Sequence, residues 1–363
     1  MLTPEIYKKI EEKNLVDTSI ALMMAYSPRA FVNTGYQIEV SKLSELRKFV
    51  DHNFEPGVEN VFLKNGKHSI ISYENAFTSE EKSKFRFIQD EVGILSEKYY
   101  NRKIKPLSNL LVQLGPHRAI SMLNKVFKKK EENISVFEIG AGHGYLGGLL
   151  SLDGYRYYSY DVTQSLYLFQ SHLLQQIAKN DFIEYVDKKD ISFNKSRVGH
   201  LPWWDFCKVF EEKIETNFDI VYSNSNLGEM SNAAIRINVM MAKRMLEKSD
   251  LGIFMFFSEG STPVNNLANI LNILQSYGFK LILEQPFFCL VLNDEIGNKL
   301  FDLFKDGVTS LNENAEKFGV QEFMDFSEET LPLDYKITKE FYIDQANEEK
   351  KIENSEFLKK FKF

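Results

Sequence analysis

Cysteine, tryptophan and long apolar runs are all scarce in this chain of 363 residues. Its two cysteines, Cys207 and Cys289, stand among apolar neighbours and have no spacing typical of a disulfide framework, a metal site or a redox motif. The longest apolar runs, such as 287–292, are the size of a strand and fall far short of the roughly 20 residues that cross a bilayer. The charged segment 1–13 lacks the apolar core of a secretory signal. We therefore expect a reduced, cytoplasmic protein with no membrane span.

Positive charge is scarcer than negative charge, with 44 Lys and Arg against 51 Asp and Glu and a net charge of −7. A chain with this balance has no overall attraction for polyanions, so no nucleic acid is expected as a partner. The hydrophobic content of 44% is ordinary for a globular protein, and the chain is long enough to bury a substantial core.

Strand-like and helix-like segments alternate between residues 134 and 293. This alternation predicts an α/β protein with a Rossmann-like, doubly wound sheet of seven strands. The expected strands are 134–139, 155–160, 182–186, 218–223, 252–257, 280–284 and 288–292, and the expected helices include 145–153, 163–179 and 263–276. The last two strands should pair antiparallel across Gln285-Pro286, although the run 335–343 competes for the last position.

The flanks of this core differ from it in character. Residues 1–110 carry mostly amphipathic helix signals, such as 82–99, with a small hairpin expected at Asn65-Gly66. This helical region could be a lid, a substrate wall or a homodimerisation arm, and the sequence leaves all three open. The core domain is expected over residues 111–295, and residues 296–363 form a short C-terminal extension.

The most informative stretch is Ile134-Ser-Val-Phe-Glu-Ile-Gly-Ala-Gly-His-Gly-Tyr-Leu-Gly147, followed by Tyr157-Tyr-Ser-Tyr-Asp161. It predicts a strand, a glycine loop, a helix and a second strand that ends in a carboxylate. Such a unit presents backbone N–H groups to a nucleoside ligand, while the second carboxylate binds a ribose hydroxyl pair. A nucleoside cofactor is therefore expected.

The spacing of the glycines alone leaves the identity of the cofactor open. Counted from Gly140, the third position of a dinucleotide fingerprint is Tyr145, which does not fit. Counted from Gly142 the fingerprint does fit, through Gly144 and Gly147. The acidic residue that precedes the loop is more informative.

Glu138 distinguishes the candidate cofactors by charge. A carboxylate two residues before the first glycine would repel a pyrophosphate at close range, whereas it suits a ligand with an ammonium and a sulfonium centre. The sequence here resembles the class I S-adenosylmethionine-dependent methyltransferases, whose first motif is acidic-x-Gly-x-Gly-x-Gly. The resemblance implies S-adenosylmethionine as the cofactor and assigns Asp161 to its ribose hydroxyls. The residues expected to bind the cofactor are Glu138, Gly140, Ala141, Gly142, Gly144, Asp161 and Asn224.

The segment Asp219-Ile-Val-Tyr-Ser-Asn-Ser-Asn-Leu-Gly-Glu-Met-Ser231 ends the expected fourth strand. Reactive groups gather beyond the carboxyl ends of the strands in a doubly wound sheet, so Asn224, Asn226 and Glu229 are expected near the transferred methyl. Asn226 would contact the acceptor, and Glu229 is a candidate general base. The Asn-Ser-Asn run also suits turn and N-cap chemistry, and both roles can hold at once.

The run His200-Leu-Pro-Trp-Trp-Asp205 is expected in a long connection between the third and fourth strands. Trp203 and Trp204 could stack on a sugar ring or on the adenine, or could anchor the loop to the core. His200 titrates near neutrality and is a second candidate base, with an ordinary exposed loop histidine as the alternative.

Metal binding has weaker support in the sequence. A hard cation prefers oxygen ligands that include carboxylates, and the end of the fourth strand offers Asn224 and Asn226 instead. Glu229 with Asp205 could supply two carboxylates, but we predict no metal site.

With the glycine motif, the residues from Asn224 to Met230 and the tryptophan pair look like the bacterial sugar O-methyltransferases found with surface-polysaccharide genes. Members of that family similarly carry an Asn-rich turn ending in Glu-Met after strand four. The resemblance covers about residues 130 to 290 and implies methyl transfer to a hydroxyl of a carbohydrate, in a surface polysaccharide or a nucleotide-linked sugar. A different small metabolite, a protein side chain, a non-catalytic binding subunit and a nicotinamide oxidoreductase remain as alternatives.

Overall fold

The computed structural model describes residues 2–17, 40–46, 78–101, 103, 110, 113–127, 133–205, 209, 214–224, 226–230, 232–257, 267–283 and 287–302. The elements within them, with η marking 3-10 helices, are α1 (Pro4–Asp17), η2 (Leu43–Glu45), α6 (Ser79–Tyr100), α8 (Leu114–Phe127), β1 (Ser135–Ile139), α9 (Tyr145–Leu152), β2 (Arg156–Asp161), α10 (Gln164–Ala178), η3 (Lys179–Asp181), β3 (Phe182–Glu184), β4 (Val198–Pro202), β5 (Ile220–Asn224), η4 (Leu227–Glu229), α12 (Asn232–Leu246), β6 (Ile253–Phe257), α13 (Leu267–Ser276), β7 (Lys280–Leu283) and β8 (Phe288–Val291). The expected hairpin at Asn65-Gly66, the run 335–343 and Cys207 lie outside the described residues.

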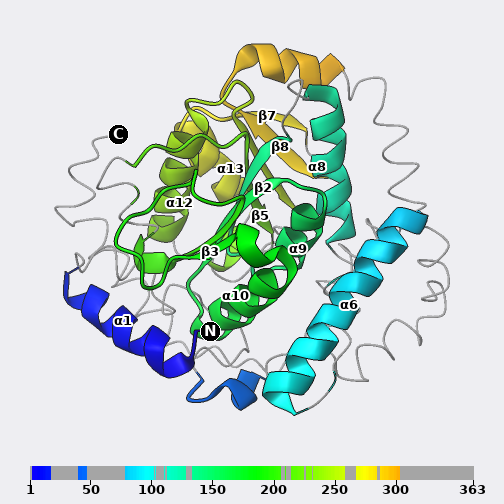
Figure 1. Cartoon of the computed structure of the whole chain (residues 1–363). Coiled ribbons are helices and arrows are strands. Elements are labelled where there is room, and N and C mark those ends of the chain that lie inside the picture. The colour runs from blue at the N-terminus through cyan, green and yellow to red at the C-terminus, as the bar shows by residue number, and fades with distance from the viewer. Residues whose placement is uncertain are drawn as a thin grey trace, which may run out of the picture.

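A mixed sheet of eight strands forms the centre of the molecule, in the order β3-β4-β2-β1-β5-β6-β8-β7 (Figure 1). β1 to β6 run parallel to one another. β8 pairs antiparallel with both β6 and β7. β1 is the first strand of the sheet along the chain. β2, β3 and β4 lie on one side of it, and the chain then crosses to β5 on the other side. The predicted doubly wound α/β class is therefore confirmed. The place where the strand order reverses, beyond the carboxyl ends of β1 and its neighbours, is where such sheets bind ligands.

The expected antiparallel closing pair is confirmed. β7 and β8 coincide with the expected strands 280–284 and 288–292. Cys289 is buried there, opposite Met255 on β6. The helices expected at 145–153 and 163–179 are also found, as α9 and α10.

The number of strands was predicted wrongly, because β4 was missed. The expected third strand, 182–186, is only the three-residue edge strand β3, and the strand beside β2 is β4. β4 reads Val-Gly-His-Leu-Pro, a composition that resembles a loop, yet all five of its residues are buried. Gly199 is required because a Cβ there would lie 2.2 Å from the ring of Tyr158 on β2.

Helices cover both faces of the sheet. In Figure 1, α8, α9 and α10 lie on one side of the strands, and α12 and α13 lie on the other. With helices on both faces, the central parallel strands have no side that faces solvent. All five residues of β1 are accordingly buried.

Two long helices of the N-terminal region add to the outside of this layered core. α6 packs against α9 and α10 through Phe85, Ile88, Val92 and Leu95, which belong to the main apolar cluster. α1 lies beside α10 and approaches the end of β4 (Figure 1). The lid and dimerisation roles of this region stay predictions. No helix in the described part of the chain combines the length and the apolarity required to cross a bilayer.

Candidate functional site

The glycine loop between β1 and α9 turns back tightly at the carboxyl edge of the sheet. Gly140, Gly142 and Gly144 have φ angles of +62°, +57° and +72°, a left-handed conformation that side chains disfavour. The N–H groups of Gly140 and Ala141 donate to the carbonyl oxygen of Tyr160 at 3.1 and 3.4 Å, which fixes the loop to the end of β2. The loop is therefore held in one shape by its neighbours.

The three glycines differ in the space around them. A Cβ on Gly140 would lie 2.4 Å from Nδ2 of Asn226, and one on Gly144 would lie 2.5 Å from Cγ of Gln170. A Cβ on Gly142 would meet nothing within 4 Å. Gly140 and Gly144 are thus closed off by protein, and Gly142 is the point at which a ligand can approach the backbone of the loop.

Asp161, the last residue of β2, lies against this loop. Its Oδ2 accepts a hydrogen bond from the N–H of Gly142 at 3.0 Å, and its Oδ1 accepts one from the N–H of Thr163 at 2.8 Å. Burial raises the pKa of Asp161 to about 6, although these backbone donors act against the shift. The carboxylate thus stands beside the open glycine, where the sequence placed a ribose contact.

Glu138 on β1 is a second buried carboxylate near the loop. The hydroxyl of Tyr157 donates to its Oε2 at 2.5 Å. Burial raises the pKa of Glu138 to about 8, the Tyr157 hydroxyl opposes the shift, and the neighbouring Asp161 adds to it. In the described part of the chain, no lysine or arginine forms an ion pair with either carboxylate.

His143 supplies no positive charge at the tip of the loop. Its ring stacks on Tyr145 with the centroids 5.4 Å apart and meets Phe169 edge-on. Burial lowers its pKa to about 4, so the imidazole is neutral near pH 7. The electrostatic character of the loop is therefore set by the two carboxylates.

The end of β5 lies beside the loop, as the sequence predicted, but its residues have separate roles. Asn224 is the half-buried last residue of the strand. Asn226 is buried, donates to the carbonyl oxygens of Ile139 and Gly140, and accepts from the hydroxyl of Ser223 at 2.6 Å. Its amide is bonded at both ends within the protein and braces the glycine loop, and a contact of Asn226 with substrate stays a prediction.

Glu229 closes η4, a short turn beyond the end of β5. Its backbone thus lies on the same edge of the sheet as the glycine loop. Its side chain is outside the described part of the structure, and its role as the base stays a prediction.

The structure contradicts the placement of His200 in an exposed loop. His200 lies inside β4 with no exposed surface, and its ring stacks on Tyr167 at 3.8 Å between centroids. Its Nδ1 is hydrogen bonded to the hydroxyl of Ser171 at 2.8 Å. Burial holds its pKa well below the usual value. The ring is enclosed, out of reach of an acceptor hydroxyl, and burial disfavours its protonated form, so we do not propose His200 as the base.

The tryptophan pair is also enclosed. Trp203 and Trp204 are each 1% exposed and pack edge to face at 5.7 Å. Trp203 donates from Nε1 to Glu11 of α1 at 2.8 Å, and Tyr7 of α1 lies 5.1 Å from Trp204. Of the two roles left open, the structure supports the anchor, because both rings are covered by α1 and neither presents a face to a substrate.

Sequence reasoning missed one set of residues at the site. α10 carries buried polar side chains that connect the N-terminal segments and the sheet. Gln170 donates to Ser159 at 2.7 Å and closes off Gly144, and Gln164 accepts from the N–H of Val40 at 2.8 Å. The signal was present in the sequence, since Gln170, Ser171 and His172 stand between the apolar runs 166–169 and 173–174.

No cluster of three or more His, Cys, Asp or Glu side chains suited to a metal ion occurs among the described residues. Asp205 is buried, and its charge helps to raise the pKa of Tyr167 and of Glu184.

The chain matches no family model and has no detectable relative among curated protein sequences. Solved structures of similar shape include a TehB-like S-adenosylmethionine-dependent methyltransferase from Corynebacterium glutamicum, with 16% identity and a TM-score of 0.34 over 49% of this chain and 85% of that one. The magnesium protoporphyrin IX methyltransferase of Synechocystis PCC 6803 with bound S-adenosylmethionine has 12% identity and a TM-score of 0.32, and the match covers 57% of this chain and 94% of that one. The glycopeptide N-methyltransferase MtfA with S-adenosylhomocysteine has 11% identity and a TM-score of 0.34, and the match covers 49% of this chain and 89% of that one. Likeness at this level says nothing about activity, and the fold is assigned from the strand order of this chain.

Proposed function

We propose that the protein is an S-adenosylmethionine-dependent methyltransferase. The observation that carries this proposal is the pair of buried carboxylates, Glu138 and Asp161, beside a glycine loop that is open only at Gly142. No described lysine or arginine pairs with them, and burial raises the pKa of both carboxyls, so their ionised forms lack a compensating cation. A ligand with a sulfonium and an ammonium centre compensates this charge, whereas a pyrophosphate would be repelled.

The residues of the loop fit such a ligand in shape as well as in charge. Without a Cβ, Gly142 lets the backbone approach the ligand closely, and Asp161 stands at the distance of one hydrogen bond from Gly142. When bound, S-adenosylmethionine supplies a methyl group on a sulfonium that a nucleophile can attack. The chain's part is to orient the donor and to exclude water, because methyl transfer depends mainly on alignment of donor and acceptor.

The finer proposal is transfer to a hydroxyl of a carbohydrate. Its support is the segment from Asn224 to Met230, which begins at the carboxyl end of β5 beside the loop and resembles the Asn-rich turn of the sugar O-methyltransferases. In this proposal Asn224 orients the donor or acceptor, and Glu229 accepts the proton of the hydroxyl. Stacking by Trp203 and Trp204 is not part of it.

Titration calorimetry with S-adenosylmethionine tests the donor site, and the chain offers a matched pair of glycines for control. The wild type should bind, and Gly142→Ala should weaken binding about tenfold or more, since the added methyl group enters the space meant for the ligand. Gly278 has a φ of +92°, and a Cβ there would likewise meet nothing within 4 Å, but it follows α13 away from the loop. Gly278→Ala should keep the wild-type affinity. A folded wild type that does not bind S-adenosylmethionine contradicts the proposal.

A screen of acceptors by release of S-adenosylhomocysteine tests the finer proposal. Release with sugars or nucleotide-linked sugars, and its loss in Glu229→Gln with donor binding kept, is the expected result. Release only with another metabolite or a protein contradicts the carbohydrate assignment. Donor binding without release for any acceptor favours the non-catalytic alternative.

A further inference from the structure

One face of β2 carries a line of polar side chains, although the strand is buried on both sides. Tyr157, Ser159 and Asp161 alternate along it and therefore point to the same side, the side that α9 and α10 cover. Ser159 accepts from Gln170 of α10 at 2.7 Å, and Asp161 accepts from the N–H of Gly142 in the glycine loop. Buried polar groups need partners of this kind. Tyr157 is the member of the line that lies farthest from the loop.

Tyr157 is fully buried between β1 and α9. Its hydroxyl donates to Oε2 of Glu138 at 2.5 Å. Its ring lies beneath Gly147 of α9, where a Cβ would come within 2.3 Å of Cε1 of the ring. Because Gly147 has no side chain, α9 can pack directly on the phenol. Gly147, which completes a dinucleotide fingerprint in the sequence, thus serves to hold Tyr157 against Glu138.

The hydroxyl of Tyr157 stays a donor over the pH range in which Glu138 titrates. Burial, together with the charge of Glu138, raises the pKa of Tyr157 well above its usual value, so the phenol keeps its proton. Burial and the charge of Asp161 raise the pKa of Glu138 to about 8, whereas the hydrogen bond from Tyr157 lowers it. The phenol therefore favours the ionised form of Glu138, which is the form that a cationic ligand needs.

The other titratable side chains at the donor site can be separated from Glu138. Asp161 has a pKa of about 6 and is mostly ionised above pH 7, and His143 has a pKa of about 4 and is neutral there. Tyr222, the register partner of Glu138 on β5, is a buried phenol, and α9 places a glycine over this part of the sheet. An effect of Tyr157 on donor binding between pH 7 and 9.5 therefore reports on Glu138.

We propose that Tyr157 is a positioning residue of the donor site, which orients the carboxylate of Glu138 and favours its ionised form for a cationic ligand. The inference rests on the proposed function for the identity of that ligand. Without the hydroxyl, the buried carboxyl loses a hydrogen bond made to its charged form and should keep its proton to a higher pH. The donor would then bind less tightly at neutral pH, but not at a pH where the carboxyl is ionised in any case.

Tyr157→Phe removes the hydroxyl and keeps the ring under Gly147. The lost hydrogen bond should raise the midpoint of the Glu138 titration by about one pH unit. Calorimetry of the full chain should then show S-adenosylmethionine affinity about tenfold below that of the wild type at pH 7, and about twofold or less below it at pH 9.5. The ratio of the two affinities cancels the titration of the ligand's own ammonium. A ratio that is the same at both pH values would mean a general loosening of the fold and overturns the proposal.

¹³C NMR of labelled glutamate carboxyl groups tests the same point without the donor. The Glu138 resonance, assigned by its absence in Glu138→Gln, should titrate about one pH unit higher in Tyr157→Phe than in the wild type. A 3-fluorotyrosine at position 157, whose more acidic hydroxyl is a stronger donor, should move the midpoint in the other direction. Tyr167→Phe is the matched control, because the Tyr167 hydroxyl also donates to a buried carboxyl, Oε1 of Glu184 at 2.5 Å. It should leave the midpoint of Glu138 unchanged.

The two measurements separate this inference from the proposed function. A wild type that does not bind S-adenosylmethionine, with a shifted Glu138 midpoint in Tyr157→Phe, contradicts the proposed function and leaves the coupling of the two side chains in place. A wild type that binds, with an unchanged midpoint in both variants at position 157, overturns the inference and leaves the proposed function intact. An equal shift in Tyr167→Phe also overturns it, because the effect would then not depend on the bond to Glu138.

Discussion

The side-chain amide of Asn226 lies against Gly140 and donates to its carbonyl oxygen at 3.3 Å. The same nitrogen donates to Ile139, and the amide oxygen accepts from Ser223 at 2.6 Å. A residue that follows β5 thereby fixes the loop that follows β1. The loop's shape depends on this contact between the two strand ends.

Asn226→Ala should destabilise the protein by about 1–3 kcal/mol, because it leaves a buried hydroxyl and two carbonyl oxygens without their partner. It should also weaken binding of S-adenosylmethionine, since the loop loses its support. Denaturant unfolding and calorimetric titration measure the two effects. Asn269→Ala is the control, because it removes one part-buried side-chain hydrogen bond, to Asn232 at 2.7 Å, and this bond does not involve the glycine loop. Equal effects of the two variants on donor affinity would show that Asn226 does not brace the loop.

The buried carboxylates predict that donor binding depends on pH. Burial raises the pKa of Glu138 to about 8, so the carboxyl is mostly protonated at pH 7 before a cationic ligand arrives. A cation favours the ionised form, and binding should therefore release a proton. Affinity should rise with pH up to about 8, by at most about tenfold per pH unit, and then level off. Calorimetry between pH 6 and 9, in buffers of different ionisation enthalpy, measures both effects.

Glu138→Gln is the matched variant for this prediction, because the amide oxygen can still accept from Tyr157. It should bind the donor more weakly and lose most of the pH dependence between 6 and 8, apart from the part due to Asp161, whose pKa is about 6. The free energy of unfolding should change with pH in the opposite sense to the donor affinity. Since the folded pKa of Glu138 lies above its ordinary value of 4.5, Glu138 contributes a decline of the free energy of unfolding as pH rises from about 4.5 to 8, and this contribution should be absent in the variant. The same pH profile of affinity in both proteins would contradict the assignment.

The glycine loop and the strands around it could be predicted because their signals are local. Gly140, Gly142 and Gly144 stand at fixed spacing after an apolar run, and their positive φ angles are a local requirement of the turn. β7 and β8 are also neighbours in sequence, and the Gln285-Pro286 break between them marks their antiparallel pairing. Elements that adjoin in sequence leave a readable pattern.

The roles of His200 and Trp203 could not be predicted because they depend on contacts far apart in the chain. Trp203 bonds Glu11, a separation of 192 residues, and no local pattern announces that α1 covers it. β4 was missed because Gly199, His200 and Pro202 look like a loop, whereas Gly199 is required by the ring of Tyr158 on the neighbouring strand. The run from His200 to Asp205 looked like a candidate site in the sequence, but it is buried, and α1 covers its two tryptophans.

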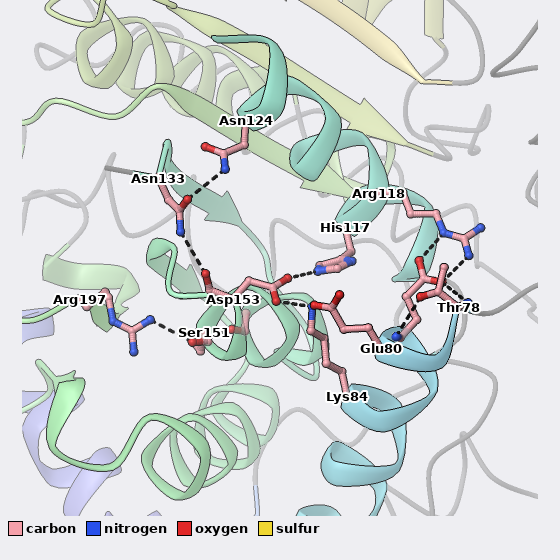
Figure 2. A network of polar contacts seen from close by, with 12 residues as sticks. Thr78, Glu80, Lys84, His117, Arg118, Asn124, Asn133, Ser151, Asp153 and Arg197 are labelled. Carbon is pink, nitrogen blue, oxygen red and sulfur yellow. Dashed lines mark hydrogen bonds and ion pairs between the residues drawn. The ribbon is translucent and has the colours of Figure 1, made fainter. Parts of the chain in front are cut away.

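A polar clamp holds α6 to the core, as Figure 2 shows. Asp153 accepts from His117 at 2.6 Å and pairs with Lys84, whereas Arg118 pairs with Glu81 at 2.6 Å. Burial alone would raise the pKa of Asp153, but the bonds from His117 and Lys84 outweigh it and hold the pKa below its usual value. Asp153 therefore stabilises the fold above its unfolded pKa, and this contribution is lost as pH falls through the folded value.

Asp153→Asn should lower the free energy of unfolding by about 1–3 kcal/mol near pH 7, since it weakens two part-buried bonds, one of them to the Lys84 ammonium. The difference from the wild type should shrink in acid, where the wild-type carboxylate is also protonated. Asp294→Asn removes an exposed pair with Lys280, with side chains 58% and 69% exposed, and should change stability by no more than about 0.5 kcal/mol. Urea unfolding at pH 7 and at pH 3 measures both variants. A loss for Asp153→Asn as small as that of the control would mean that the clamp contributes nothing.

The two tryptophans provide a matched test of the anchor against a substrate contact. Trp203 donates to Glu11 at 2.8 Å, whereas the ring N–H of Trp204 has no hydrogen bond partner within the described part of the chain. Both rings are buried to the same extent, so replacement of either by phenylalanine removes a similar apolar area.

Trp203→Phe should therefore lower the free energy of unfolding by about 1 kcal/mol more than Trp204→Phe does, the net value of one hydrogen bond. Glu11→Gln keeps an acceptor for Trp203 and should keep most of the wild-type stability. Glu11→Ala should lower the free energy of unfolding by about as much as the lost hydrogen bond does in Trp203→Phe. Donor affinity and the KM for an accepted sugar should change little in either tryptophan variant. A large rise in KM without loss of stability would mean that a ring faces the acceptor after all, because only a substrate contact would separate the two measurements in that way.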